Sequence, residues 1–294
     1  MWSRIKKLFA AEPAPSKKPE VLSEPWREIN WGNNGDDLEF VKNYEPSTEG
    51  QVVRIFLHGP PGAGKSSFIN SVQSVLHGRI YRQALANNTN DGCFTKKHTT
   101  YKIQKDNETY PFVFHDIMGL HISTGVLVED IRLALKGHVK EGYRFNPESS
   151  LSEDDQYYNK SPKLNDTVHV LVCVIPADTL AIMYDEVIKK IKSVRKDASM
   201  LDMPQVAILT KIDLICPEMK EDIKNVYKVL DLKEKMEKFS AAVGIPMNCI
   251  FPVKNYHEEI DMNEDMDSLI LSAMKNILDC GNDFYKTHFQ SESS

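Results

Sequence analysis

Eight residues, Gly59-Pro60-Pro61-Gly62-Ala63-Gly64-Lys65-Ser66, constrain the fold of this chain more than any other segment. They match the pattern G-x-x-x-x-G-K-[ST] and stand between an apolar run at 52–59 and a helix-like stretch at 66–78. Glycines let backbone N–H groups turn inward around phosphates, where larger side chains would collide. A strand, this loop and a helix in succession predict a phosphate-binding loop (P-loop) in an α/β fold.

Short apolar runs alternate with helical segments along the rest of the chain. Continuous apolar runs, typical of strands covered on both faces, occupy 168–175, 205–210 and 249–253. Runs at 99–105 and 110–116 bracket a polar turn and predict a hairpin. Helices are expected mainly at 179–196, 217–243 and 267–278. The pattern predicts a P-loop NTPase (G-domain) fold, a three-layer α/β sandwich whose mixed, mostly parallel sheet has one antiparallel hairpin edge.

The chain divides into three parts by composition. Residues 1–24 form a basic tail and a Pro-rich linker that is expected to be disordered. The G domain is expected at 25–285, with Trp26 and Trp31 as anchors for the arriving chain. A polar stretch without periodicity at 141–167 is either a functional insertion or a disordered loop. Residues 286–294 complete the chain as a polar tail.

Composition excludes several classes of protein. The 36 Lys and Arg against 42 Asp and Glu give a net charge of −6, which argues against sequence-independent nucleic-acid binding. Five scattered cysteines without a C-x-x-C pair indicate reduced thiols, not disulfides or structural zinc. The longest apolar run is about half a membrane span, and the charged first nine residues do not resemble a secretory signal. We expect a cytoplasmic location.

The P-loop predicts a role for each of its residues. Lys65 would reach the β and γ phosphates as a catalytic cation, and the Ser66 hydroxyl would ligate Mg²⁺. The nucleotide-binding residues expected in this segment are Gly59, Gly62, Ala63, Gly64, Lys65, Ser66 and Ser67.

Asp116-Ile117-Met118-Gly119 is a D-x-x-G motif at the end of an apolar strand. Asp116 would hold Mg²⁺ through water, and the N–H of Gly119 would sense the γ-phosphate. The P-loop alone also resembles that of AAA-type ATPases, but these place a catalytic Glu directly after the Asp. Because Ile117 follows Asp116, the sequence favours a GTPase over an AAA-type ATPase.

Thr210-Lys211-Ile212-Asp213 follows an apolar strand and matches the guanine motif [NT]-K-x-D. The Asp213 carboxylate would accept hydrogen bonds from N1–H and the 2-amino group of guanine, a donor pair that adenine lacks. The stem of Lys211 would cover the purine. After the last strand, Pro252-Val253-Lys254-Asn255 stands where a final base-contacting loop is expected, with Lys254 as the contact; an ordinary strand end is the alternative.

The switch residues are less sharply defined. Thr95, Thr99 and Thr100 could close over Mg²⁺, and Thr100 is preferred, followed by Thr99. Leu120 stands where Ras-type GTPases carry a water-orienting glutamine, so unaided hydrolysis should be slow. His121, another residue or a partner could supply the missing group.

The order of these motifs resembles the interferon-induced protein 44-like family of GTPases. The likeness spans roughly 25–284 and is carried by PWREINW, GPPGAGKSSFINSV, KKHTTYKI, HDIMGL, LKGHVKEGYRFNP, LTKID, PVKNY and LILSAMKNILDCGNDF. It implies a cytoplasmic guanine-nucleotide-binding protein that is induced by interferon and acts in the innate antiviral response. Longer members resemble proteins with an additional N-terminal TLDc-type domain, and the residues before Pro25 are too few to hold one.

Two functions stay open from the sequence. The first is a slow Mg²⁺-dependent GTPase that cycles between GTP and GDP; the second is a GTP-dependent scaffold with negligible turnover that acts by self-association. Residues 1–9 place apolar side chains at helical spacing among basic ones, which suits reversible contact with anionic membranes. A solvated tail, or a helix packed on the G domain, fits the same pattern.

Overall fold

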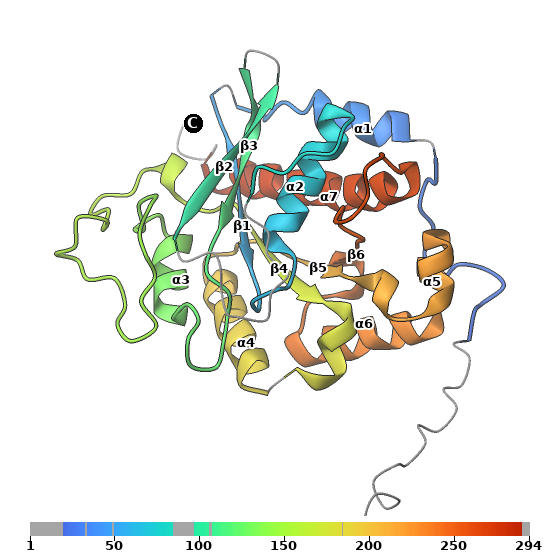
Figure 1. Ribbon diagram of the computed structural model, residues 1–294. Helices are drawn as coiled ribbons and strands as arrows, with labels where there is room; N and C mark the ends of the chain where they lie inside the picture. Colours follow the sequence, from blue (N-terminus) through green and yellow to red (C-terminus); the bar gives the residue numbers. More distant parts are fainter. Residues whose placement is uncertain are drawn as a thin grey trace, which may run out of the picture.

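The computed structural model describes residues 20–32, 34–48, 50–84, 97–105, 108–183 and 185–289. Its centre is a six-stranded sheet with the order β2-β3-β1-β4-β5-β6 (Figure 1). The strands are β1 (Val53–His58), β2 (Thr99–Lys105), β3 (Glu108–Asp116), β4 (Val170–Pro176), β5 (Gln205–Thr210) and β6 (Ile250–Pro252). Only β2 is antiparallel to its neighbour among these strands, and it lies at the edge, as the hairpin pattern predicts.

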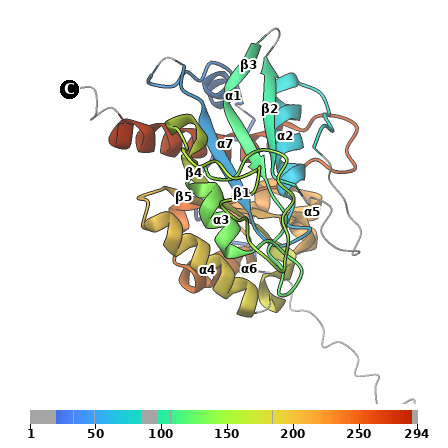
Figure 2. The same ribbon diagram turned by 90° about the vertical axis from the view of Figure 1, so that its left-hand side faces the viewer.

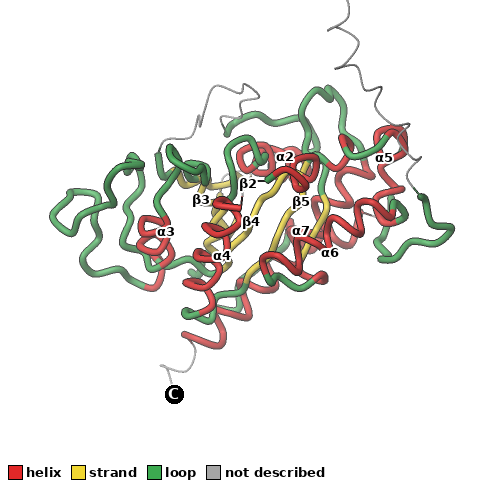
Figure 3. The backbone as a smooth tube through the Cα atoms, turned by 90° about the horizontal axis from the view of Figure 1, so that it is seen from below, coloured by secondary structure: helices red, strands yellow, loops and turns green. Residues whose placement is uncertain are grey.

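Helices cover both faces of the sheet (Figure 3). One face carries α1 (Asn34–Lys42), α2 (Lys65–His77) and α7 (Glu264–Phe289). The opposite face carries α3 (Val128–Leu135), α4 (Asp185–Ser199) and α6 (Leu230–Val243). The short α5 (Pro217–Glu221) packs beside the 3₁₀ helices Ile212–Leu214 and Ile223–Tyr227. None of the helices in the described part of the chain is both long and apolar enough to cross a lipid bilayer.

Alternation along the strands divides the apolar side chains between two cores. In β1, Ile55 and Leu57 pack with the α2 and α7 layer, while Phe56 packs with the α3 and α4 layer. Every residue of β4 is buried, as expected for a strand covered on both faces. The three-layer α/β G-domain architecture predicted from the sequence is therefore confirmed.

The N-terminal segment docks on the domain earlier than residue 25, where the sequence analysis ends the disordered linker. Val21 forms an antiparallel bridge with Val229, and the N–H of Leu22 donates to the carbonyl of Lys228 at 2.9 Å. Trp26 meets Tyr227 edge to face with ring centroids 5.1 Å apart. Trp31 is half-buried against the same core, so both tryptophans serve as the expected anchors. Residues 1–19 lie outside the described part of the chain.

The polar stretch 141–167 is irregular but tied to the domain at many points. Figure 2 shows it beside α3 and in front of the sheet. The buried carboxylate of Asp130 in α3 accepts a hydrogen bond from the N–H of Leu151 at 2.7 Å, and Val139 bridges to Tyr158. These contacts hold the stretch against α3 and the sheet.

Several helices differ from the expected bounds. The segment 179–196 begins as a 3₁₀ helix, Ala177–Ile182, before α4 starts at Asp185. The segment 217–243 is broken into α5, a 3₁₀ helix (Ile223–Tyr227) and α6. The last helix continues to Phe289, past the boundary expected at 285, and in this part the tilted rings of Phe284 and His288 lie with centroids 4.2 Å apart. The sequence analysis did not identify α1 or α3.

Candidate functional site

All the predicted nucleotide motifs lie at the carboxyl edge of the sheet. The P-loop follows β1, the D-x-x-G segment follows β3, and the T-K-x-D segment follows β5. Strand β1 lies between β3 and β4, so the chain turns to opposite sides of β1 as it continues. Ligands of open α/β sheets bind at such a switch point, outside the carboxyl ends of the strands.

At two positions of the P-loop the backbone passes so close to neighbouring atoms that only glycine fits. A Cβ at Gly59 (φ +146°) would lie 2.0 Å from the carbonyl oxygen of Val174 in β4. Gly64 (φ +92°) is the residue before α2, and a Cβ there would lie 2.9 Å from Nδ2 of Asn255. No side chain caps the first turn of α2, so its N–H groups remain available to an anion. Ser67 is in that first turn; its carbonyl accepts from Ser71 Oγ at 2.8 Å.

The cationic side chain of the P-loop and the two candidate Mg²⁺ ligands, Ser66 and Asp116, lie close together. Lys65 is buried, and its Nζ lies 3.4 Å and 3.3 Å from the carbonyl oxygens of Gly59 and Pro60. Ser66 Oγ donates to Oδ2 of Asp116 at 2.5 Å. The other carboxylate oxygen of Asp116, Oδ1, is buried and has no hydrogen-bond partner among the described residues.

The electrostatics of Asp116 fit a divalent cation. Burial raises the pKa of Asp116, while the charge of Lys65 and the hydrogen bond from Ser66 oppose that rise. A buried carboxylate with an unused oxygen gains stabilisation from a cation. No group of three or more His, Cys, Asp or Glu in the described ranges could hold a metal. A Mg²⁺ ion here would therefore take its remaining ligands from phosphates and water, as Mg²⁺ commonly does.

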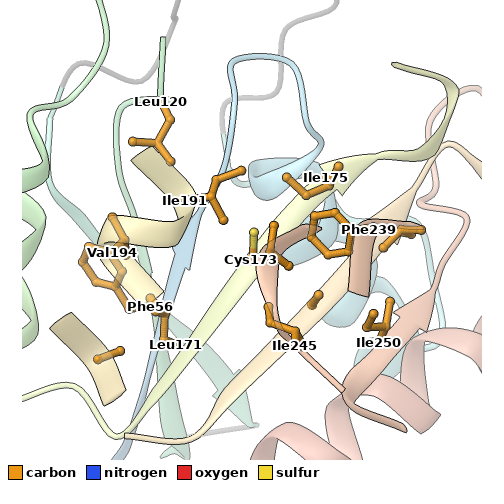
Figure 4. Close-up of a cluster of buried hydrophobic side chains, with 14 of the residues drawn as sticks. Phe56, Leu120, Leu171, Cys173, Ile175, Ile191, Val194, Phe239, Ile245 and Ile250 are labelled. Atoms are coloured by element: carbon orange, nitrogen blue, oxygen red, sulfur yellow. The ribbon is translucent and has the colours of Figure 1, made fainter. Parts of the chain in front are cut away.

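The D-x-x-G segment packs directly against the P-loop. A Cβ at Gly119 would lie 2.5 Å from the backbone nitrogen of Pro61, and the N–H of Leu120 donates to the carbonyl of Gly59 at 2.8 Å. The Leu120 side chain is fully buried in the same cluster as Ile191 and Val194 of α4 (Figure 4). Leu120 thus faces the core, and a polar side chain at this position would not reach water without rearrangement.

His121 is the exposed residue next to Leu120. Its Nδ1 accepts hydrogen bonds from Thr124, from the hydroxyl at 2.9 Å and from the backbone N–H at 3.3 Å. Lys190 Nζ in α4 donates to the His121 carbonyl at 2.6 Å. Because Nδ1 accepts from a backbone N–H, a neutral His121 carries its proton on Nε2.

The guanine motif is joined to the P-loop. Thr210 Oγ1 donates to the carbonyl of Ala63 at 2.5 Å, so Thr210 holds the loop in place. Lys211 follows with a left-handed backbone (φ +56°), which turns the chain away from β5. Asp213 lies in the next turn, a 3₁₀ helix, and is partly exposed. Lys211 and Asp213 therefore stand beside the P-loop with their side chains outside the core.

The loop after β6 contributes a residue that the sequence analysis did not select. Lys254 forms an ion pair with Glu259 at 2.9 Å, whereas Asn255 Nδ2 donates to the carbonyl of Gly64 at 3.2 Å. Oδ1 of Asn255 is buried and has no partner among the described residues. The loop was identified from its position after the last strand, but only the folded structure reveals which of its side chains turns toward the P-loop.

Strand register places the two switch threonines Thr99 and Thr100 on opposite faces of the sheet. Thr100 pairs with His115, and its Oγ1 lies 3.4 Å from Nδ1 of that residue. Thr99 pairs with Asp116. Directly opposed residues share a face of a sheet and successive residues alternate, so Thr99 shares the face of Asp116 and Thr100 does not. The structure does not bring Thr100 to the metal-ligand candidates, and Thr95 lies outside the described residues.

Two solved structures share this fold over most of the chain. Two structures of Toc33 from Arabidopsis thaliana, one a dimerization-deficient mutant and one in complex with GDP and Mg²⁺, align with TM-scores of 0.50. Each alignment covers 86% of this chain and 93% of the Toc33 chain, at 12% and 13% sequence identity respectively. At such low identity the likeness shows the fold alone.

Curated sequences give a closer relationship, although no family model matches the chain. Interferon-induced protein 44 from Mus musculus is 34% identical over 250 residues, and the Homo sapiens protein is 35% identical over 251. Interferon-induced protein 44-like from Homo sapiens is 29% identical over 252 residues. Each match covers 84% of this chain but only 56–59% of the relative's length. Over these residues the chain is a homologue of the interferon-induced protein 44 and 44-like proteins, the family that its motifs indicate.

Proposed function

We propose that this chain binds GTP and GDP with Mg²⁺ and hydrolyses GTP slowly. The observation that carries the proposal is the 2.5 Å hydrogen bond from Ser66 to Asp116, which places two predicted Mg²⁺ ligands together at the uncapped start of α2. An anion-binding helix end beside a metal-binding carboxylate is the arrangement that a nucleotide phosphate chain with its Mg²⁺ requires.

The phosphate end of the site would be formed by the P-loop. Backbone N–H groups from Gly62 to Ser66 would donate to phosphate oxygens, and Lys65 would move from the loop carbonyls it now contacts to the β and γ phosphates. Ser66 and Asp116 would hold Mg²⁺, which supplies positive charge against the phosphates when bound. Gly119, whose backbone abuts the P-loop at Pro61, would offer its N–H to the γ-phosphate. A threonine of the switch segment would complete the site, and register favours Thr99.

The base end would be formed by Lys211 and Asp213. Their segment is fixed to the P-loop through Thr210 and Ala63, so a bound base and its phosphates would share one rigid frame. The Asp213 carboxylate would accept the two donors of guanine, and the Lys211 stem would cover the ring. This pairing supports GTP over ATP as the ligand.

Slow turnover follows from Leu120. Its side chain is fully buried, so this position offers no group to orient the attacking water. His121, the exposed residue next to Leu120, could act on the water or phosphate, and a partner is the other source. The same observation supports a second candidate function, a GTP-dependent scaffold that self-associates with negligible turnover.

The names of the homologues support a biological setting for either function. We propose that the chain acts in the interferon-induced antiviral response, in the cytoplasm, because its relatives are named as interferon-induced.

Thermal unfolding with and without nucleotide tests the binding proposal. GTP with Mg²⁺ should raise the melting temperature of the full chain, whereas Lys65→Ala and Ser66→Asn should abolish that rise and leave the melting temperature without nucleotide within a few degrees. Lys189→Ala, an exposed cation of α4, is the matched control and should respond like the wild type. Full stabilisation of Lys65→Ala by GTP would show that the P-loop does not bind the phosphates.

Single-turnover hydrolysis at varied protein concentration separates the slow GTPase from the scaffold. If a second subunit completes the site, the rate should be low in dilute protein and rise with concentration, because a supplied arginine can be worth ~10³–10⁵ in rate. Nucleotide-dependent association without turnover at any concentration would favour the scaffold. Fast turnover at every concentration would contradict both.

A further inference from the structure

A cavity of about 420 Å³ lies on the α3 face of the sheet, away from the P-loop. It is enclosed by strands β1–β3, the end of α3 and the 138–168 segment; its lining includes Arg54, His98, Thr100, His115, Lys140 and Asp166. Arg54 is near the start of β1, whereas the P-loop follows its end. The volume falls within the range of small-molecule sites, so the cavity is large enough for a ligand of its own.

Arg54 supplies a cation to this cavity. Its side chain is partly buried, and its Nε is fully enclosed without a hydrogen-bond partner among the described residues. Burial lowers the pKa of Arg54, and the charges of Asp166 and Glu141 partly offset that effect. Neither carboxylate lies within ion-pair distance of Arg54 in the described structure. A guanidinium held in this way is stabilised by an anion that enters the cavity.

Two stacked histidines supply an unpaired acceptor. His98 Nδ1 lies 3.4 Å from the carbonyl of Lys140, which can only accept, so this nitrogen carries the proton. His98 Nε2 then accepts from His115 Nδ1 at 3.0 Å. His115 is therefore left with a lone pair on Nε2, and this buried atom has no hydrogen-bond partner in the described ranges.

We propose that this cavity binds a small organic anion that also carries a hydroxyl group. The phosphate or carboxylate of the ligand pairs with the Arg54 guanidinium, and a ligand hydroxyl donates to His115 Nε2. The carboxylates of Asp166 and Glu141, which also line the cavity, repel a second anionic group, so the ligand carries one anionic end. Nothing in this proposal depends on guanine-nucleotide binding at the P-loop.

The test follows the imidazole signals of His98 and His115 by ¹⁵N-edited NMR of the full chain. Glycerol phosphate and glycerate serve as probes, since they present the same hydroxyls with a phosphate or a carboxylate. At least one probe should shift both imidazole signals, and the one that binds identifies the anionic group. Calorimetry on the same samples gives the affinity.

Matched variants assign the binding to the cavity. Arg54→Gln should weaken binding at least about tenfold, since it removes a charged hydrogen bond. Arg54→Lys keeps the positive charge but lacks the planar guanidinium with its paired N–H donors. This variant should bind the probe with intermediate affinity. Arg82→Gln removes an exposed cation elsewhere and should bind like the wild type. Lys65→Ala disables the P-loop cation and should also leave probe binding unchanged.

Three outcomes would overturn the proposal. The first is the absence of any His98 or His115 shift with both probes up to about 10 mM, a concentration at which even weak ligands bind. The second is a response that persists at full affinity in Arg54→Gln. The third is a response lost in Lys65→Ala, which would assign the probe to the P-loop instead.

Discussion

Asp116 and its neighbour His115, at the end of β3, face two different sites. Its carboxylate faces Ser66 and the P-loop, while its neighbour His115 lines the cavity on the α3 face. The same alternation in β2 places Thr99 with Asp116 and Thr100 with His115. Single-residue steps along these strands therefore decide whether a side chain belongs to the nucleotide site or to the cavity.

Leu120 gives a prediction at the residue scale. Replacing it with glutamine, the water-orienting residue of Ras-type proteins, should destabilise the fold by about 1–3 kcal/mol, because the amide would be buried without partners. It should not accelerate GTP hydrolysis. Urea unfolding and single-turnover assays measure the two effects, and Leu120→Met, which conserves volume, should keep nearly wild-type stability. Faster hydrolysis in a Leu120→Gln protein of unchanged stability would show that this side chain can face the nucleotide.

At the scale of elements, Arg27 is one of the residues that hold the N-terminal segment on the domain. Its guanidinium donates to the carbonyl of Ile250 at 2.6 Å and to that of Met247. Its Cζ also lies over the rings of Trp26 and Tyr227, 5.1 Å and 5.5 Å from their centroids. These contacts join the arriving chain to the edge strand β6 and to the segment before α6. The Arg27 side chain thus occupies a backbone carbonyl of the edge strand β6.

Arg27→Ala should lower the free energy of unfolding by about 1–3 kcal/mol, because two backbone carbonyls lose a charged donor. Arg27→Lys should recover only part of this loss, since an ammonium cannot reproduce the planar two-carbonyl contact. Chemical denaturation of both variants provides the measurement. Equal stability of Arg27→Ala and the wild type would mean that the segment is not held by this residue.

The strands were predictable from sequence, and two of the helices were not. Runs such as 168–175 and 205–210 are apolar at nearly every position, and burial on both faces leaves few other structures for them. Helix α1 carries mostly polar residues; it is held by packing on α7 and by the 2.8 Å ion pair between Asp37 and Lys275. Helix α3 has only eight residues, too few to show a clear period.

In the candidate site, too, some residues could be predicted from the sequence and others could not. Gly59, Lys65, Ser66 and Asp116 were predictable because phosphate and metal binding demand these residue types at fixed spacing. The choice between Thr99 and Thr100 depends on strand register, and that between Lys254 and Asn255 on how a loop turns. The spacing of residues along the sequence predicts neither the strand register nor the conformation of this loop. The burial of Leu120 likewise depends on α4, which is distant in the sequence.

At the scale of the whole molecule, the sheet separates distinct surfaces. The carboxyl edge gathers the P-loop, Asp116 and the T-K-x-D segment, while the α3 face holds the cavity with the 141–167 insertion against it. The chain spans about 56–59% of the length of the curated relatives it matches. The activity proposed here is therefore that of the G domain, which this chain contains.

The central claim is that this edge of the sheet binds guanine nucleotides, and nucleotide competition on wild type and Asp213→Asn tests it most directly. The wild type should prefer GTP to ATP and XTP. Asp213→Asn should weaken GTP binding at least about tenfold and shift preference toward XTP. The amide can accept only one of the two guanine donors, whereas its N–H can donate to the 2-oxo group of xanthine. A folded Asp213→Asn protein with unchanged GTP affinity and no preference for XTP would contradict the account.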